Sequence, residues 1–110
     1  MTSKQFTPAA EDADVVEGAL YAAVVDGVPV LLVRLNGVVH AIGRICTHED
    51  ADLAQGSIED GCVVCPLHGS KFDLVTGAAL TLPAFEPEPV FEVRIEGGTI
   101  YVGVPDDDAI

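Results

Sequence analysis

The sequence predicts an all-β protein, a small antiparallel β-sandwich or barrel framework with a subdomain inserted into it. Three observations predict this class. Short apolar runs rich in β-branched residues recur along the chain, pairs of turn-forming residues separate them, and one central stretch breaks the pattern. The length of 110 residues suits one domain, so we expect residues 1–110 to form a single domain without a linker or an internal repeat.

The apolar runs form two groups, one on each side of the central stretch. Asp26-Gly27 and Asn36-Gly37 separate the runs of the first group, and Gly97-Gly98 separates those of the second. Such pairs favour type I′ turns, which need two residues at positive φ, so each pair predicts a hairpin. The predicted strands cover residues 19–25, 28–35, 38–42, 91–96 and 99–104.

The rest of the framework has weaker signals. Residues 9–16 are the only stretch with a briefly helical pattern. Pro83, Pro87 and Pro89 predict an irregular connection before the last hairpin, because proline cannot donate to a strand ladder.

The central stretch, about residues 43–80, is predicted to be a subdomain built around a site. Here the apolar alternation thins out while Cys, His, Gly, Asp and Pro accumulate. It contains Cys46-Thr47-His48 and, after 16 further residues, Cys65-Pro66-Leu67-His68-Gly69. Each pair offers a thiolate and an imidazole at a spacing typical of loops, so two loops can meet around a metal.

Two kinds of metal centre use such a set of side chains. One is a structural Cys₂His₂ zinc site, although zinc fingers usually pair like with like, whereas each pair here mixes Cys and His. The other is a [2Fe–2S] cluster with two imidazoles on one iron, which raises the potential into a range of about −150 to +300 mV. Imidazole also leaves a ring nitrogen that can couple a proton to the electron.

The charge of the chain restricts its partners. There are 18 acidic and 5 basic residues, a net charge of −13 with His neutral. Phosphate backbones and anionic membrane surfaces repel such a protein, so we expect no nucleic acid and no membrane partner. A protein with a basic docking patch is favoured, although the charge could equally serve only to keep a small protein soluble. With no membrane span and no export signal visible, we expect a cytoplasmic protein.

No catalytic machinery is visible in the sequence. There is no nucleophile–base pair and no phosphate-binding glycine loop. A mononuclear iron site needs two further histidines and a carboxylate, and only His40 remains outside the two pairs. We therefore expect a protein without a substrate of its own.

The two Cys/His pairs and their surroundings resemble the Rieske iron–sulfur motif. Further matches are Phe72-Asp73 and Thr76-Gly77 after the second pair, and the resemblance covers nearly the whole chain. It is closest to the small Rieske ferredoxins of aromatic ring-hydroxylating dioxygenases. The resemblance implies a Rieske-type [2Fe–2S] cluster held at one iron by two cysteines and at the other by two histidines at a solvent-exposed tip: Cys46, Cys65, His48 and His68.

The same resemblance implies the partners. A flavin-containing ferredoxin reductase would reduce the cluster, and the protein would pass single electrons to a terminal Rieske oxygenase. Nothing demands a homo-oligomer, so we expect a monomer. The open alternatives are a Rieske-like small subunit of a nitrite-reductase-type enzyme and a zinc-stabilised binding module.

The sequence also departs from the high-potential Rieske proteins of respiratory complexes. Those proteins carry a disulfide between the two loops, where this chain has Ala51 and Leu67. Ser70 matches their hydrogen-bonding serine, but Phe72 stands where they have a tyrosine and has no hydroxyl to donate. Fewer donors to sulfur stabilise the reduced cluster less, which predicts a potential in the lower part of the Rieske range.

A few polar residues lie outside the ligand set. Cys62 precedes the second loop in a short apolar strand and is predicted to be a buried thiol. We expect His40 to be a surface or packing residue and Lys71 a solvated one. Three acids that directly follow the first histidine are candidates for a docking face: Glu49, Asp50 and Asp52.

Overall fold

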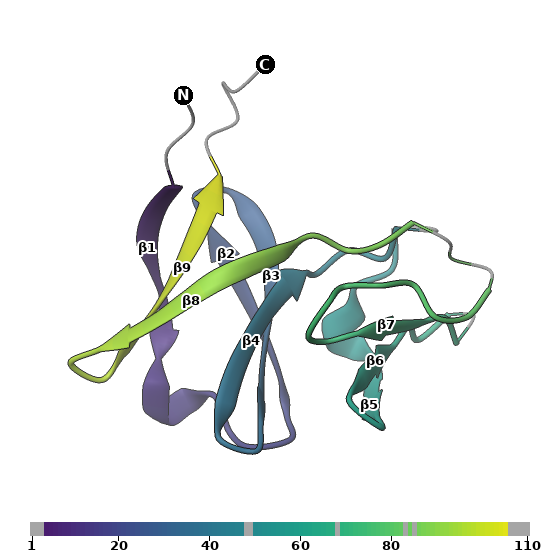
Figure 1. Cartoon of the computed structure of the whole chain (residues 1–110), viewed down its shortest axis with the longest axis horizontal. Coiled ribbons are helices and arrows are strands. Elements are labelled where there is room, and N and C mark those ends of the chain that lie inside the picture. Colours follow the sequence, from purple (N-terminus) through teal and green to yellow (C-terminus); the bar gives the residue numbers. More distant parts are fainter. Residues whose placement is uncertain (1–3, 48–49, 68, 83, 85, 106–110) are drawn as a thin grey trace.

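The computed structural model describes residues 4–47, 50–67, 69–82, 84 and 86–105, and these form two antiparallel sheets (Figure 1). A curled six-stranded sheet makes the framework, and a three-stranded sheet lies beside it. The all-β prediction is confirmed. No helix among the described residues has the length and apolar character needed to cross a membrane.

The strands of the large sheet follow the order β1-β9-β8-β4-β3-β2, and those of the small sheet the order β5-β6-β7. Two single 3₁₀ turns, η1 and η2, accompany them. The bounds are β1 (Lys4–Glu11), η1 (Asp12–Asp14), β2 (Leu20–Val25), β3 (Val28–Leu35), β4 (Val38–Gly43), η2 (Leu53–Gln55), β5 (Ser57–Glu59), β6 (Cys62–Val64), β7 (Lys71–Asp73), β8 (Val90–Glu96) and β9 (Thr99–Pro105).

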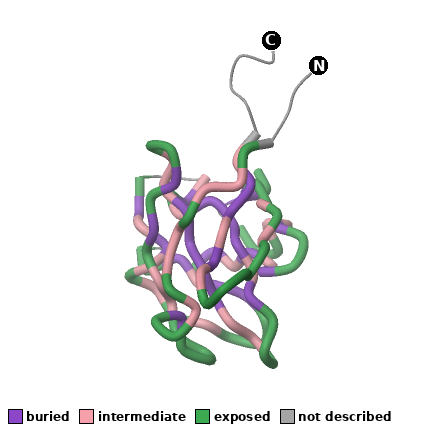
Figure 2. Tube along the Cα trace, turned by 90° about the vertical axis from the view of Figure 1, so that its left-hand side faces the viewer, coloured by how far each residue is buried: buried purple, intermediate pink, exposed green. Residues whose placement is uncertain are grey.

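Strand β3 is buried on both faces, which explains its unbroken apolar run. Val30 and Leu32 point into a core inside the curled sheet, which we call the barrel core. Leu31 and Val33 point the other way, into the core between the framework and the small sheet, which we call the site core. Figure 2 shows buried positions running through the middle of the molecule. Ile42 on β4 joins the same core, so the small sheet is packed onto the framework through residues of both β3 and β4.

The predicted hairpins form as expected. Asp26-Gly27, Asn36-Gly37 and Gly97-Gly98 all have positive φ, as type I′ turns require. Each of the five predicted strands agrees with an observed strand to within one residue at either end.

The helical prediction for residues 9–16 is wrong. The first of these residues continue β1, whose partner is β9, and only η1 follows. Pairing with β9 outweighs the short helical pattern in the sequence, although β1 contains Pro8, a residue that is unfavourable in strands. Proline is tolerated because β1 lies at the edge of its sheet, next to an irregularity in register between Pro8 and Ala10.

Candidate metal centre

Cys46, from the first Cys/His pair of the sequence, lies in a tight hairpin. Ile45 forms an antiparallel bridge with Asp52, and the Cys46 N–H donates to the Ala51 carbonyl at 2.9 Å. The Leu53 N–H donates to the Arg44 carbonyl at 2.8 Å. These bonds close a loop of residues 46–51, the first loop.

Cys65, from the second pair, lies in a loop built the same way. Strands β6 and β7 bring Val64 opposite Lys71, and the Cys65 N–H donates to the Ser70 carbonyl at 2.8 Å. Gly69 has a φ of 76° with open space around it, so this turn needs glycine for its backbone and not for room. In residues 65–70, the second loop, the cysteine N–H again bonds the carbonyl five residues ahead.

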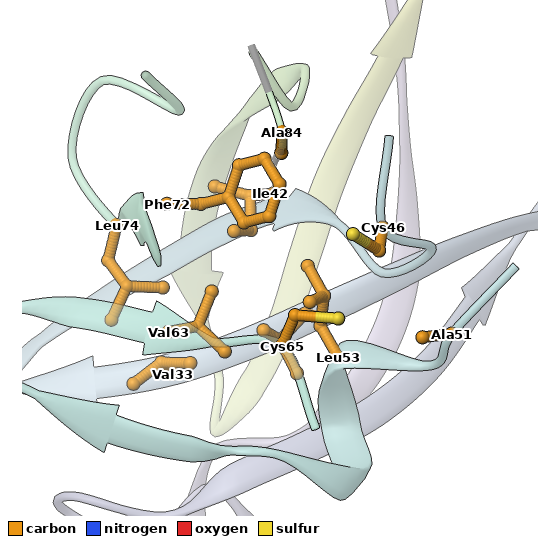
Figure 3. Packing of buried hydrophobic residues seen from close by; sticks show 11 residues of the cluster. Val33, Ile42, Cys46, Ala51, Leu53, Val63, Cys65, Phe72, Leu74 and Ala84 are labelled. Atoms are coloured by element: carbon orange, nitrogen blue, oxygen red, sulfur yellow. The ribbon is translucent and has the colours of Figure 1, made fainter. Parts of the chain in front are cut away.

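The two cysteine side chains share one core. Cys46 is 4 % exposed and Cys65 is 3 % exposed, and both belong to the site core. Figure 3 shows their side chains turned toward the same part of that cluster. Two cysteine side chains are thus brought into one core from segments almost twenty residues apart.

Both predicted histidine ligands, His48 and His68, lie outside the described residues, as does Glu49. Among the residues that are described, no three Cys, His, Asp or Glu side chains gather closely enough to hold a metal ion.

A third segment contacts both loops. We call its described residues, 84 and 86–88, the strap. The Ala84 N–H donates to the buried Ser70 hydroxyl at 3.1 Å, and the Thr47 hydroxyl donates to the Glu86 carbonyl at 2.7 Å. The sequence predicts an irregular connection here, but no pattern in it indicates that the connection contacts the site.

The structure describes all four residues that were compared above with the high-potential Rieske pattern. Phe72 and Ala51 are both buried members of the site core, whereas Leu67 is 62 % exposed. The Ser70 hydroxyl accepts a bond from Ala84, which leaves its own hydrogen available for donation.

Two of the surface expectations change. Asp52 caps η2 by accepting from the Ala54 N–H at 2.9 Å, and its Oδ1 lies 3.3 Å from Arg44 Nε. Asp52 therefore supports the first loop, whereas Asp50 is exposed. Lys71 is not simply solvated, because its Nζ lies 2.5 Å from Glu59 Oε1 on β5.

Cys62 and His40 fit their predicted roles. Cys62 is buried, its thiol points to the Asp60 carbonyl at 3.8 Å, and burial raises the pKa of that thiol. His40 is half-buried on β4 and lines a shallow groove together with Asp73.

Comparison with known proteins adds a family match over most of the chain. A family model described as the Rieske [2Fe-2S] domain matches residues 5–95. The 3-phenylpropionate/cinnamic acid dioxygenase ferredoxin subunit of Escherichia coli strain K12 is 42 % identical over 96 residues, which cover 86 % of this chain and 89 % of the relative.

Solved structures agree with this match. The ferredoxin of carbazole 1,9a-dioxygenase from Nocardioides aromaticivorans IC177 has a TM-score of 0.85 at 33 % identity, covering 89 % of this chain and 96 % of that one. A complex of reduced oxygenase and oxidized ferredoxin in carbazole 1,9a-dioxygenase contains a chain with a TM-score of 0.79 at 30 % identity, covering 86 % of this chain and 98 % of that one.

Proposed function

This chain belongs to the Rieske [2Fe–2S] domain family, and from that premise we propose that four of its side chains hold the cluster. Cys46 and Cys65 would bind one iron, and His48 and His68 the other. The family carries a [2Fe–2S] cluster and the relatives are named ferredoxin subunits, so the chain is an electron-transfer protein and not a catalytic one. The cluster supplies one-electron chemistry, and the chain supplies its ligands and surroundings.

The observation that carries the proposal is the matched geometry of the two loops. Each cysteine N–H bonds the carbonyl five residues ahead, and both sulfur-bearing side chains turn into the same part of the site core. The donors fit an iron–sulfur cluster, because thiolates are its usual ligands and the apolar surroundings keep water from them. The histidines would complete the set from the tips of the same loops.

Residues around the cysteines would set the potential. Ser70 has a hydroxyl hydrogen available for a cluster or cysteine sulfur, whereas the buried ring of Phe72 has none. With one such donor in place of two, the reduced state gains less stabilisation. We expect the potential to lie in the lower part of the Rieske range.

The partners follow from the relatives. A flavin-containing reductase would deliver electrons to this protein, which would deliver them to a terminal Rieske oxygenase of an aromatic ring-hydroxylating dioxygenase system. The named complex of a ferredoxin with its oxygenase supports the second step. The net charge of −13 supports docking to basic patches on both partners.

The remaining expectations are part of the same proposal. Residues 1–110 would form one domain whose cluster-binding subdomain spans about residues 43–80, and the protein would act as a monomer in the cytoplasm. The shared site core supports one folding unit, because framework strands and both loops contribute to it.

Stopped-flow mixing tests this function. The protein is reduced with dithionite, freed of excess reductant, and mixed under nitrogen with the oxidised terminal oxygenases of the 3-phenylpropionate and carbazole dioxygenases. We expect oxidation at a rate that rises with oxygenase concentration, while the Cys46→Ser variant shows no such phase. A wild-type protein that stays reduced with both oxygenases would contradict the proposal.

A further inference from the structure

Glu88 is a buried acid in the strap that ligation does not use. Its side chain is 4 % exposed, and its Oε2 has no hydrogen-bond partner among the described residues. Burial raises the pKa of this carboxyl to about 7, and a hydrogen bond from the Thr47 backbone N–H opposes that rise. Burying a carboxyl oxygen without a hydrogen-bond partner lowers the stability of the fold.

The surroundings are shaped to admit this side chain. A Cβ on Gly43 would lie 2.5 Å from Glu88 Oε1 and 2.9 Å from Pro89 Cδ, so only glycine leaves room for the carboxyl. The backbone is held as well, because the Glu88 N–H donates to the Gly77 carbonyl at 2.8 Å and the Gly43 N–H to the Pro89 carbonyl at 2.9 Å. The carboxyl is thus fixed against the end of β4, just before the first loop.

The strap holds Thr47 from two directions. The Thr47 backbone N–H donates to the Glu88 carboxyl, and its hydroxyl donates to the Glu86 carbonyl at 2.7 Å. Thr47 stands between Cys46 and His48 in the chain, so holding its peptide restricts the backbone that carries both proposed ligands. The second loop has one comparable bond to the strap, from Ala84 to Ser70.

We propose that Glu88 is a positioning residue, whose carboxyl fixes the Thr47 peptide and thereby the geometry of Cys46 and His48 at the cluster. This role rests on the proposed ligation by these residues. Glu88 acts through its acceptor oxygen at a fixed reach, and it touches no reacting atom. A carboxyl that served only the stability of the fold would leave the electronic properties of the cluster unchanged.

Three substitutions of Glu88 separate the effect of where its acceptor oxygen lies from the effect of its acidic charge. Glu88→Gln keeps an acceptor oxygen at the same reach, Glu88→Asp keeps the acid and withdraws it by one methylene, and Glu88→Leu removes the acceptor. The matched control is Glu86→Gln, because Glu86 is exposed on the same strap and contacts Thr47 only through its backbone carbonyl. The readouts are the EPR g-values of the reduced, cluster-loaded protein and its midpoint potential.

We expect Glu88→Gln and Glu86→Gln to keep the wild-type g-values, and Glu88→Asp and Glu88→Leu to shift or broaden the signal and to change the potential. Wild-type spectra and potentials in Glu88→Asp would overturn the proposal, and this variant decides if Glu88→Leu fails to fold. A wild-type protein without a reduced-state signal would instead overturn the ligation itself.

Discussion

Cys46 and Cys62 are both buried cysteines of the same small region, yet only the first is a proposed ligand. Cys46 closes the first loop with its N–H, whereas Cys62 lies on β6 with its thiol directed at the Asp60 carbonyl. The pKa of the Cys62 thiol is raised by burial, which disfavours the thiolate that iron requires. Position in a loop, and not burial alone, distinguishes the two.

Serine substitutions test this distinction. Cys46→Ser removes a proposed thiolate ligand, so we expect purified protein with near-background iron and no visible absorption from a cluster. Cys62→Ser is the matched control and should retain wild-type iron content. Iron assay and visible spectra of the two variants, prepared in parallel, provide the measurement, and equal loss of iron in both would contradict the assignment.

Glu88 predicts a pH dependence of stability. The pKa of its carboxyl is raised from 4.5 to about 7 in the fold, so the folded state holds the proton over a range where the unfolded chain releases it. The contribution of Glu88 to the free energy of unfolding therefore falls as pH rises from the pKa in the unfolded chain to the pKa in the fold. The fall is roughly 3 kcal/mol at most, and the contribution is level at higher pH. Glu88→Gln should not show this fall.

The difference in unfolding free energy between the wild type and Glu88→Gln, measured by denaturant titration at several pH values between 4 and 8, isolates this group from the other acids. We expect the difference to change in favour of the variant as pH rises. A difference that stays constant across the range would show that Glu88 does not titrate as described.

At the scale of elements, the strap depends on a close backbone contact at Gly77. Gly77 has a φ of 77°, and a Cβ there would lie 2.2 Å from the Glu88 carbonyl oxygen. Gly61 has a φ of 78° with nothing within 4 Å of its would-be Cβ. The two glycines share the same left-handed backbone conformation and differ in crowding.

Alanine at each position measures that crowding. Gly61→Ala should cost roughly 1–2 kcal/mol from its left-handed backbone alone. Gly77→Ala should cost more, because the strap must move away, and it should also weaken iron retention. Thermal midpoints and iron content provide the comparison, and equal effects of the two substitutions would mean that the strap yields freely at Gly77.

Hairpins with two-residue turns were predictable, because pairs such as Asp26-Gly27 favour positive φ whatever the rest of the chain does. The approach of Cys46 and Cys65 in two loops was predictable because the Cys/His spacing is specific. Strand β1 was not, since it depends on pairing with β9, which lies almost a hundred residues away. Nor was the strap, because its bonds to Thr47 and Ser70 arise only once the sheets have packed together.

At the scale of the whole molecule, the acidic charge bears on the proposed docking of a partner. The net charge is −13, and Asp50 stays exposed in the first loop while Asp52 is paired. The β8–β9 hairpin lies at the opposite end of the molecule from the small sheet (Figure 1). An acid on that hairpin, Glu96, shares the exposure of Asp50 without its place near the site.

Charge reversal at the two ends tests where docking occurs. Asp50→Lys should slow electron transfer to the oxygenase by a factor on the order of a few at low ionic strength and flatten its salt dependence, since it removes attraction at the contact. Glu96→Lys changes the net charge equally and should have a smaller effect. Stopped-flow rates at several salt concentrations give the comparison, and equal effects would indicate that only net charge matters.

The most direct test of the central claim is the visible and EPR spectrum of protein purified under nitrogen, with iron, sulfide and zinc assayed on the same sample. Ligation of a Rieske-type cluster by Cys46, His48, Cys65 and His68 predicts a red-brown protein with about two irons and two sulfides per chain and an EPR signal only after reduction. A colourless protein that contains zinc and no sulfide would contradict it.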